Sequence, residues 1–166
     1  MENLQKQRLS KLVMEVVWWG VTAIAAFIIV QPLWAYFQRY DFIYELIWYS
    51  IIFITFARYI LFLKYTFLAH FQIMKFILIF VSLPLIFYMV QEFFEFQDFL
   101  ERQNSGLEEA QIYFKEGMGF QDRYSILAYL SKAYTFFAIA AIITVIMTPF
   151  RMLKSYWRVH NNTGTV

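Results

Sequence analysis

Five ionisable side chains lie inside long apolar stretches of this sequence, where a charge is costly and often functional. They are two acids, Glu15 and Glu45, and three bases, Arg58, Lys75 and Lys132. If the apolar stretches are membrane helices, Glu15 and Arg58 lie within about two turns of one membrane surface, and Glu45 and Lys132 lie within about two turns of the other. The matching depths predict two opposite-charge pairs, Glu15 with Arg58 and Glu45 with Lys132.

Arg58 has an alternative, because a long basic side chain can extend to the headgroups instead of forming a pair, and the same holds for Lys75. No charge lies at the middle of any apolar stretch. A proton path would need ionisable groups there. The expected role of the pairs is therefore structural.

A second group of acids follows the third apolar stretch at helical spacing and consists of Glu92, Glu95 and Asp98. The group is either a surface for docking a partner or a solvated helix face along the headgroups. Calcium needs six to eight oxygen ligands, usually from a loop, and no such loop is recognisable. We therefore expect no metal site.

Other chemistry has little support. The chain has no cysteine, which excludes disulfides, thiolate metal sites and cysteine nucleophiles. It lacks the common hydrolase, phosphate-binding and dinucleotide-binding motifs. One of its two histidines, His160, falls in a polar tail, which disfavours haem ligation. We expect no enzymatic activity and no cofactor, and the net charge of +2 gives no reason to expect nucleic acid as a partner.

Composition indicates which elements must position these residues. Of 166 residues, 61% are hydrophobic, 22% are aromatic and only 16% are charged, whereas a soluble domain carries about 25% charged residues. Apolar runs of about 18 residues or more are typical of membrane helices. The sequence predicts an all-α integral membrane protein with four transmembrane helices, at about 12–34, 42–64, 71–90 and 126–150, in a single domain.

The segment "ARYILFLKYTFLAHFQIMK", residues 57–75, carries Arg58, Lys64, His70 and Lys75 and contains neither Gly nor Pro. One unbroken helix from Phe42 to Val90 would be about 73 Å long. The hydrocarbon core is only about 30 Å thick. We therefore predict that the chain turns back at residues 65–69.

The charge distribution sets the orientation. Bases exceed acids in the N-terminal segment, in the predicted turn and in the C-terminal tail, while residues 91–124 hold eight acids and three bases. Cytoplasmic segments carry the excess of Lys and Arg. We expect both termini in the cytoplasm and residues 91–124 outside, in a plasma or inner membrane. We also expect the third helix to extend to about Gln103, and a short external helix from Ser105 to Gly117.

Small residues predict which helices approach closely. The first stretch offers Gly20, Ala23 and Ala26, and the fourth offers Ala141, Thr144 and Thr148. We expect the first and fourth helices to pack tightly, against each other or against a partner subunit. The second and third are crowded with large side chains and should form a bulky hairpin that faces lipid, a lipid-like ligand or another protein.

These patterns favour a non-enzymatic accessory or scaffolding subunit of a larger membrane complex. A small oligomeric ion channel or transporter component is the alternative, and a protein that binds a lipid or a quinone is a third. Membrane lipids and other membrane subunits are the expected partners.

Overall fold

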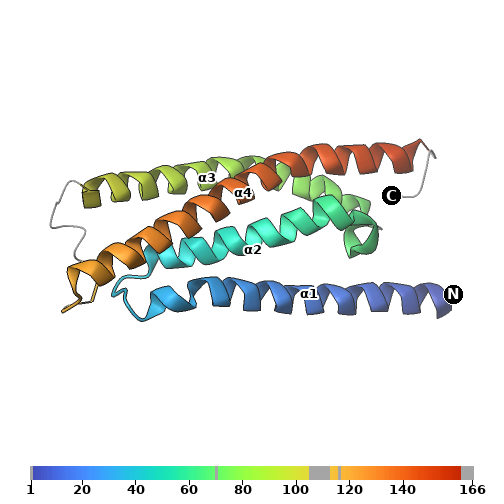
Figure 1. The fold of residues 1–166 in the computed structure, drawn as a ribbon. Helices are drawn as coiled ribbons and strands as arrows, with labels where there is room; N and C mark the ends of the chain where they lie inside the picture. The colour runs from blue at the N-terminus through green and yellow to red at the C-terminus, as the bar shows by residue number, and fades with distance from the viewer. Residues whose placement is uncertain (1, 70, 105–112, 116, 162–166) are drawn as a thin grey trace.

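The computed structural model describes residues 2–69, 71–104, 113–115 and 117–161, and it is helical almost throughout (Figure 1). The long helices are α1 (Glu2–Trp34), α2 (Asp41–Phe62), α3 (Gln72–Asn104) and α4 (Phe120–His160). All four are long and apolar enough to cross a membrane. The prediction of an all-helical chain with four candidate spans is confirmed, and it indicates a multi-pass membrane protein.

The chain reverses direction between α2 and α3, as predicted. Two short 3₁₀ helices, η1 (Leu63–Tyr65) and η2 (Phe67–Ala69), separate the two long helices. Thr66 lies between them in an extended conformation, and its hydroxyl donates to the Leu63 carbonyl at 2.8 Å. This contact replaces the helical hydrogen bonds that the turn interrupts.

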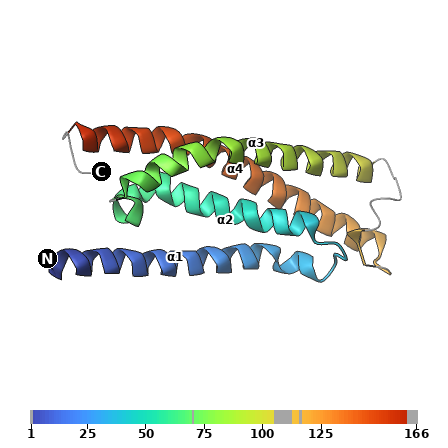
Figure 2. The ribbon, with the colours of Figure 1, turned by 180° about the vertical axis from the view of Figure 1, so that it is seen from behind.

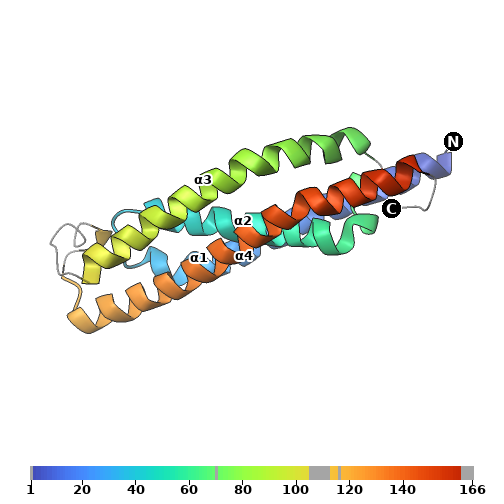
Figure 3. The ribbon, with the colours of Figure 1, turned by 90° about the horizontal axis from the view of Figure 1, so that it is seen from above.

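The four helices form an elongated bundle in which α1 begins, and α4 ends, at the same end (Figures 1 and 2). We call this end, which also holds the α2–α3 turn, the terminal end, and the opposite one the loop end. Helix α2 packs against α1 and α4, and α3 packs against α4 (Figure 3). Contact between the backbones of α2 and α3 is slight.

A continuous buried seam explains the central place of α4. Its buried residues recur every three or four positions along almost the whole helix, which keeps them on one face. They are Leu130, Tyr134, Ala138, Ala141, Val145, Thr148, Met152 and Ser155. Small side chains in the middle of the seam allow neighbouring helices to approach closely.

Helix α3 enters the core along a narrower line. Lys75, Ser82, Met89 and Phe96 are buried and are spaced seven residues apart. This spacing matches the seam of two helices that pack at a small angle. Most of the remaining surface of α3 is exposed, as expected for a helix that faces lipid.

The predicted packing of the first helix on the fourth within the chain is wrong, because α1 lies along α2 and approaches α4 mainly near the loop end. There, the Tyr129 hydroxyl donates to the Ile29 carbonyl at 2.9 Å. Ala26 is buried, but Gly20 and Ala23 are exposed on other faces of α1. The predicted α2–α3 hairpin is likewise looser than expected, since α4 packs against both helices.

The predicted packing residues of α4, Ala141, Thr144 and Thr148, lie on or beside its buried seam. Ala141 and Thr148 are fully buried and Thr144 is partly buried. The seam extends beyond Pro149, so α4 continues to His160 instead of ending near residue 150. Met152 and Ser155 keep the helical period and pack, which accounts for the longer helix.

At the loop end, two connecting segments meet in a short antiparallel bridge between Phe37 and Phe114. The Gln38 amide donates to the Tyr113 carbonyl at 2.8 Å, and the Lys115 amide donates to the Tyr36 carbonyl at 3.1 Å. Residues 105–112, which hold most of the predicted short helix, lie outside the described part of the chain. Helix α3 does extend to Asn104, as expected.

Candidate functional site

A crevice of about 410 Å³ lies between α2 and α3, where their backbones stay apart. From α2 it is lined by Glu45, Trp48, Tyr49, Ile52 and Phe56. From α3 it is lined by Val81, Leu85, Tyr88, Met89 and Glu92. On both helices the lining residues recur every three or four positions, so each helix contributes one face.

Because α2 and α3 run in opposite directions, Glu45 lies at the level of Glu92, and Phe56 lies at the level of Val81. Both carboxylates are therefore at the end of the crevice nearer the loop end. The rest of the lining is aromatic and aliphatic. The crevice is thus an apolar slot with one acidic end, inside two candidate membrane spans.

Large side chains hold α2 and α3 apart at this position. The buried Tyr49 hydroxyl donates to the Met89 carbonyl at 2.6 Å, which places a whole phenol ring between the two backbones. The exposed fractions of Trp48 and Tyr88 are 65% and 59%, so part of the crevice lining lies on the outer surface of the bundle. In a bilayer these surroundings are lipid chains.

Tyr134 of α4 fixes the acidic end. Its hydroxyl donates to Glu45 Oε2 and lies 3.4 Å from the Glu92 backbone carbonyl oxygen. The ring is fully buried and stacks on Phe96, with ring centroids 3.8 Å apart. It also meets the Tyr49 ring edge-on at 5.2 Å. One tyrosine therefore links α2, α3 and α4.

The predicted pair of Glu45 with Lys132 does not form, and Tyr134 takes the place of the lysine. Lys132 is exposed and lines a separate open groove on α4 with Ser131 and Thr135. Two residues along a helix correspond to a rotation of about 200°. Since Tyr134 faces Glu45, Lys132 points away from it. In the sequence, the four-residue spacing of Leu130, Tyr134 and Ala138 indicates that Tyr134 shares a helix face with these apolar residues.

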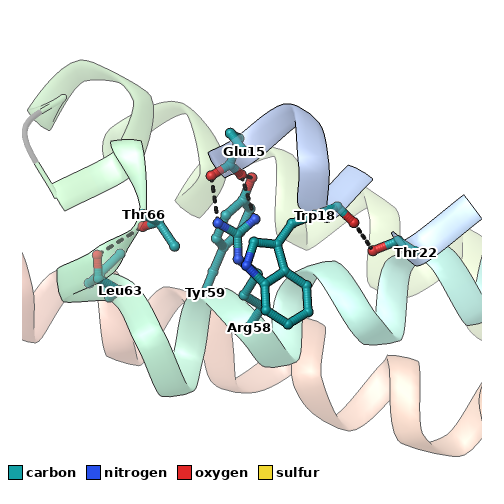
Figure 4. A network of polar contacts seen from close by, with 7 residues as sticks. All are labelled: Glu15, Trp18, Thr22, Arg58, Tyr59, Leu63 and Thr66. Atoms are coloured by element: carbon teal, nitrogen blue, oxygen red, sulfur yellow. Dashed lines mark hydrogen bonds and ion pairs between the residues drawn. The ribbon is translucent and has the colours of Figure 1, made fainter. Parts of the chain in front are cut away.

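The predicted pair of Glu15 with Arg58 is present near the terminal end (Figure 4). The guanidinium donates to both carboxylate oxygens of Glu15, at 3.0 and 2.8 Å. The Tyr59 hydroxyl donates to the same carboxylate at 2.8 Å, and the guanidinium lies 5.3 Å from the centroid of the Trp18 ring. The Arg58 and Glu15 side chains are only 11% and 7% exposed. This cluster joins α1 to α2. Its donors and acceptors are hydrogen-bonded to one another.

Lys75 does not extend to the headgroups. It is fully buried, and its ammonium donates to the Ala69 carbonyl at 3.2 Å and to the Ser155 hydroxyl at 2.9 Å. Nearby, Arg151 Nε donates to the Ile60 carbonyl at 3.0 Å. The bonds of Lys75 to Ser155 and of Arg151 to Ile60 connect α4 to the chain on either side of the α2–α3 turn.

The predicted acidic surface divides between two environments. Glu92 is half-buried and lines the crevice, whereas Glu95 and Asp98 are exposed. Glu95 accepts a hydrogen bond from the Gln91 amide at 3.2 Å. Across the described ranges, no group of three or more potential ligands could hold a metal ion.

Comparisons with protein-family models, with curated proteins and with solved structures found no match to this chain.

The Glu15 cluster predicts a stability effect. Replacement Glu15→Gln leaves the buried Arg58 guanidinium without a counter-charge, and removal of one partner of a buried pair typically costs about 3–5 kcal/mol. We expect a loss near the lower value, about 3 kcal/mol, in the free energy of unfolding. Unfolding in a single detergent, followed by circular dichroism, measures it.

Glu95→Gln is the matched control, because Glu95 is exposed and makes no ion pair with a described residue. The double variant Glu15→Leu with Arg58→Met should regain part of the lost stability, since it removes both buried charges. Equal stability of Glu15→Gln and Glu95→Gln would show that the Glu15 cluster does not stabilise the fold.

Proposed function

We propose that this protein is a non-enzymatic, multi-pass membrane protein that holds an amphipathic lipid in the crevice between α2 and α3. The supporting observation is the crevice itself, an apolar slot of about 410 Å³ with carboxylates at one end only. Binding pockets for small molecules are typically about 300–1,000 Å³ and mainly apolar, with a few polar groups that fix orientation. An amphiphile has the same division into an apolar body and a polar head.

A binding role is favoured over a catalytic one by the use of the polar groups at the acidic end. The hydroxyl hydrogens of Tyr49 and Tyr134 are already donated to the Met89 carbonyl and to Glu45. Proton transfer to a substrate needs a positioned donor or base that is free to exchange with it. The tyrosines of the site instead hold helices together.

Lipid retention tests this proposal. Val81 lines the crevice and is 48% exposed, so Val81→Trp fills the slot from its edge without disturbing a fully buried position. We expect wild-type protein purified in a mild detergent to carry bound lipid at a fixed ratio, and Val81→Trp to carry a small fraction of it. Native mass spectrometry measures the ratio.

Val17→Trp, on the exposed surface of α1, is the control and should retain lipid as the wild type does, because Val17 is 53% exposed and outside the crevice. Equal lipid in Val81→Trp and wild type, or no retained lipid in the wild type, would contradict the proposal.

We further propose that the terminal end faces the cytoplasm, in a plasma or inner membrane. Bases gather there, at Lys64 in η1 and at Arg151, Lys154 and Arg158 near the end of α4. Acids predominate in residues 91–124, toward the loop end. An excess of Lys and Arg in short flanking segments is the strongest sequence signal for the cytoplasmic side.

Topology mapping tests this orientation. Epitope tags placed beside Asn3 and beside Thr163 should both be protected in intact cells and become accessible only after permeabilisation. A tag inserted at residues 105–112 should be accessible without permeabilisation. Accessibility of either terminal tag in intact cells would overturn the orientation.

A second role, as an accessory subunit of a membrane complex, is favoured by the surface of α1. This helix packs mainly on α2, and no atom lies within 4 Å of a Cβ placed at Gly20. Ala23 is exposed beside it. Small residues on a free helix face permit a second membrane helix to approach closely.

Affinity purification tests the subunit role. Wild-type protein in mild detergent should bring down a distinct membrane protein at a fixed ratio, and Ala23→Leu should reduce that ratio because its bulk separates the helices. Ala23→Ser keeps the small volume and should behave as the wild type. Purification of the wild type without a stoichiometric partner would contradict this role.

A further inference from the structure

The acidic end of the crevice has two carboxylates and, in the described chain, no basic side chain. Glu45 and Glu92 line it, and no Lys, Arg or His is part of the lining. An ionised carboxylate accepts hydrogen bonds and donates none. Among the described residues neither acid forms an ion pair. The Tyr134 hydroxyl donates to Glu45 Oε2, and Glu92 interacts with the side chains of Tyr88 and Glu45.

These half-buried carboxylates are less fully hydrogen-bonded than the buried charged residues Glu15 and Lys75. Glu15 receives a guanidinium and a hydroxyl, and Lys75 receives a carbonyl and a hydroxyl. A charge out of water is stabilised by hydrogen bonds, and most strongly by hydrogen bonds to a partner of opposite charge. The described lining of the crevice supplies no side chain of opposite charge, so a cationic group of a ligand would find both carboxylates without a basic partner.

We propose that the crevice selects a membrane amphiphile with one apolar chain and a primary ammonium head, of the long-chain amine or amino alcohol type. An ammonium has three donors and no acceptor, which complements a pair of carboxylates. Its bonds to carboxylates are charge-assisted and therefore stronger than those of a neutral head. The inference rests on the proposed lipid binding and specifies the head group.

The dimensions and openness of the slot fit one chain. From Val81 to Glu92 the α3 wall spans roughly 17 Å along the helix. The exposed walls formed by Trp48, Val81 and Tyr88 let a chain move in sideways from the bilayer. With the head at Glu45 and Glu92, the chain lies along Ile52 and Leu85 toward Phe56. A fatty acid would place a third carboxylate at the acidic end, and like charges repel.

Three probes of equal chain length test the head-group preference: tetradecylamine, tetradecanol and tetradecanoate. Each is titrated into delipidated full-length protein in a non-ionic detergent, and binding is followed by tryptophan fluorescence and native mass spectrometry. We expect the amine to bind about tenfold more tightly than the alcohol. The reason is that a hydrogen bond from a charged ammonium to a carboxylate is stronger than one from a neutral hydroxyl, by about the free energy that corresponds to a tenfold change in affinity. The carboxylate should bind most weakly.

The variants Glu45→Gln and Glu92→Gln should each reduce the ratio of amine to alcohol affinity toward one. Glu95→Gln, on the exposed face of the same helix as Glu92, should keep the wild-type ratio. At position 45, glutamine retains an amide oxygen that can accept the hydrogen bond from the Tyr134 hydroxyl. If Glu45→Gln nevertheless fails to fold, Glu92→Gln alone tests the head-group preference.

The outcomes separate the two proposals. Equal binding of all three probes, lost in Val81→Trp, would overturn the ammonium preference and leave lipid binding in place. Tighter binding of the carboxylate, or an unchanged ratio in both glutamine variants, would also overturn the preference alone. Absence of binding by every probe, together with no retained lipid after purification, would overturn both.

Discussion

The buried seam of α4 is the constraint on which the rest of this bundle depends. In a membrane, lipid chains are as apolar as leucine, so helices associate through close packing and not through removal of apolar surface from water. Ala138 and Ala141 supply the close approach at the centre of α4, and α2 and α3 both pack against this helix. Two helices that share a third as their main neighbour have less surface for each other. The crevice between α2 and α3 follows from this arrangement, and the ring of Tyr49 keeps it open.

The two ends of the bundle treat charge differently. At the terminal end, the Arg58 guanidinium, the Lys75 ammonium and Arg151 Nε each find an acceptor on another part of the chain. These bonds connect α1 to α2 and connect α4 to the segment around the α2–α3 turn. Toward the loop end, Glu45 and Glu92 have tyrosine neighbours, and the described lining of the crevice holds no Lys, Arg or His. Because an uncompensated charge away from water is unfavourable, this asymmetry is the physical reason for proposing an ammonium ligand.

A lipid in this slot would also contribute to the fold. It would contact both α2 and α3 along the faces where their backbones are apart, and a molecule that binds only the folded state stabilises that state. Lipid binding and a subunit role are compatible in space, since the crevice lies between α2 and α3 whereas the free small residues Gly20 and Ala23 lie on α1.

Length and hydrophobicity by themselves determined four helices and the turn near residues 65–69, because a bilayer of about 30 Å limits how far an apolar helix can run. Matched depth likewise sufficed for the pair of Glu15 and Arg58, which lies on adjacent helices. Only the tertiary structure decided which faces meet. Depth in the membrane could not distinguish Lys132 from Tyr134, because these residues lie at similar heights on α4 and differ in which way they point around the helix. The positions of small residues could not show that α1 packs mainly against α2. Sequence fixes a residue's height along a helix, but its partner depends on the helix's rotation and neighbours, which are set by packing over the whole bundle.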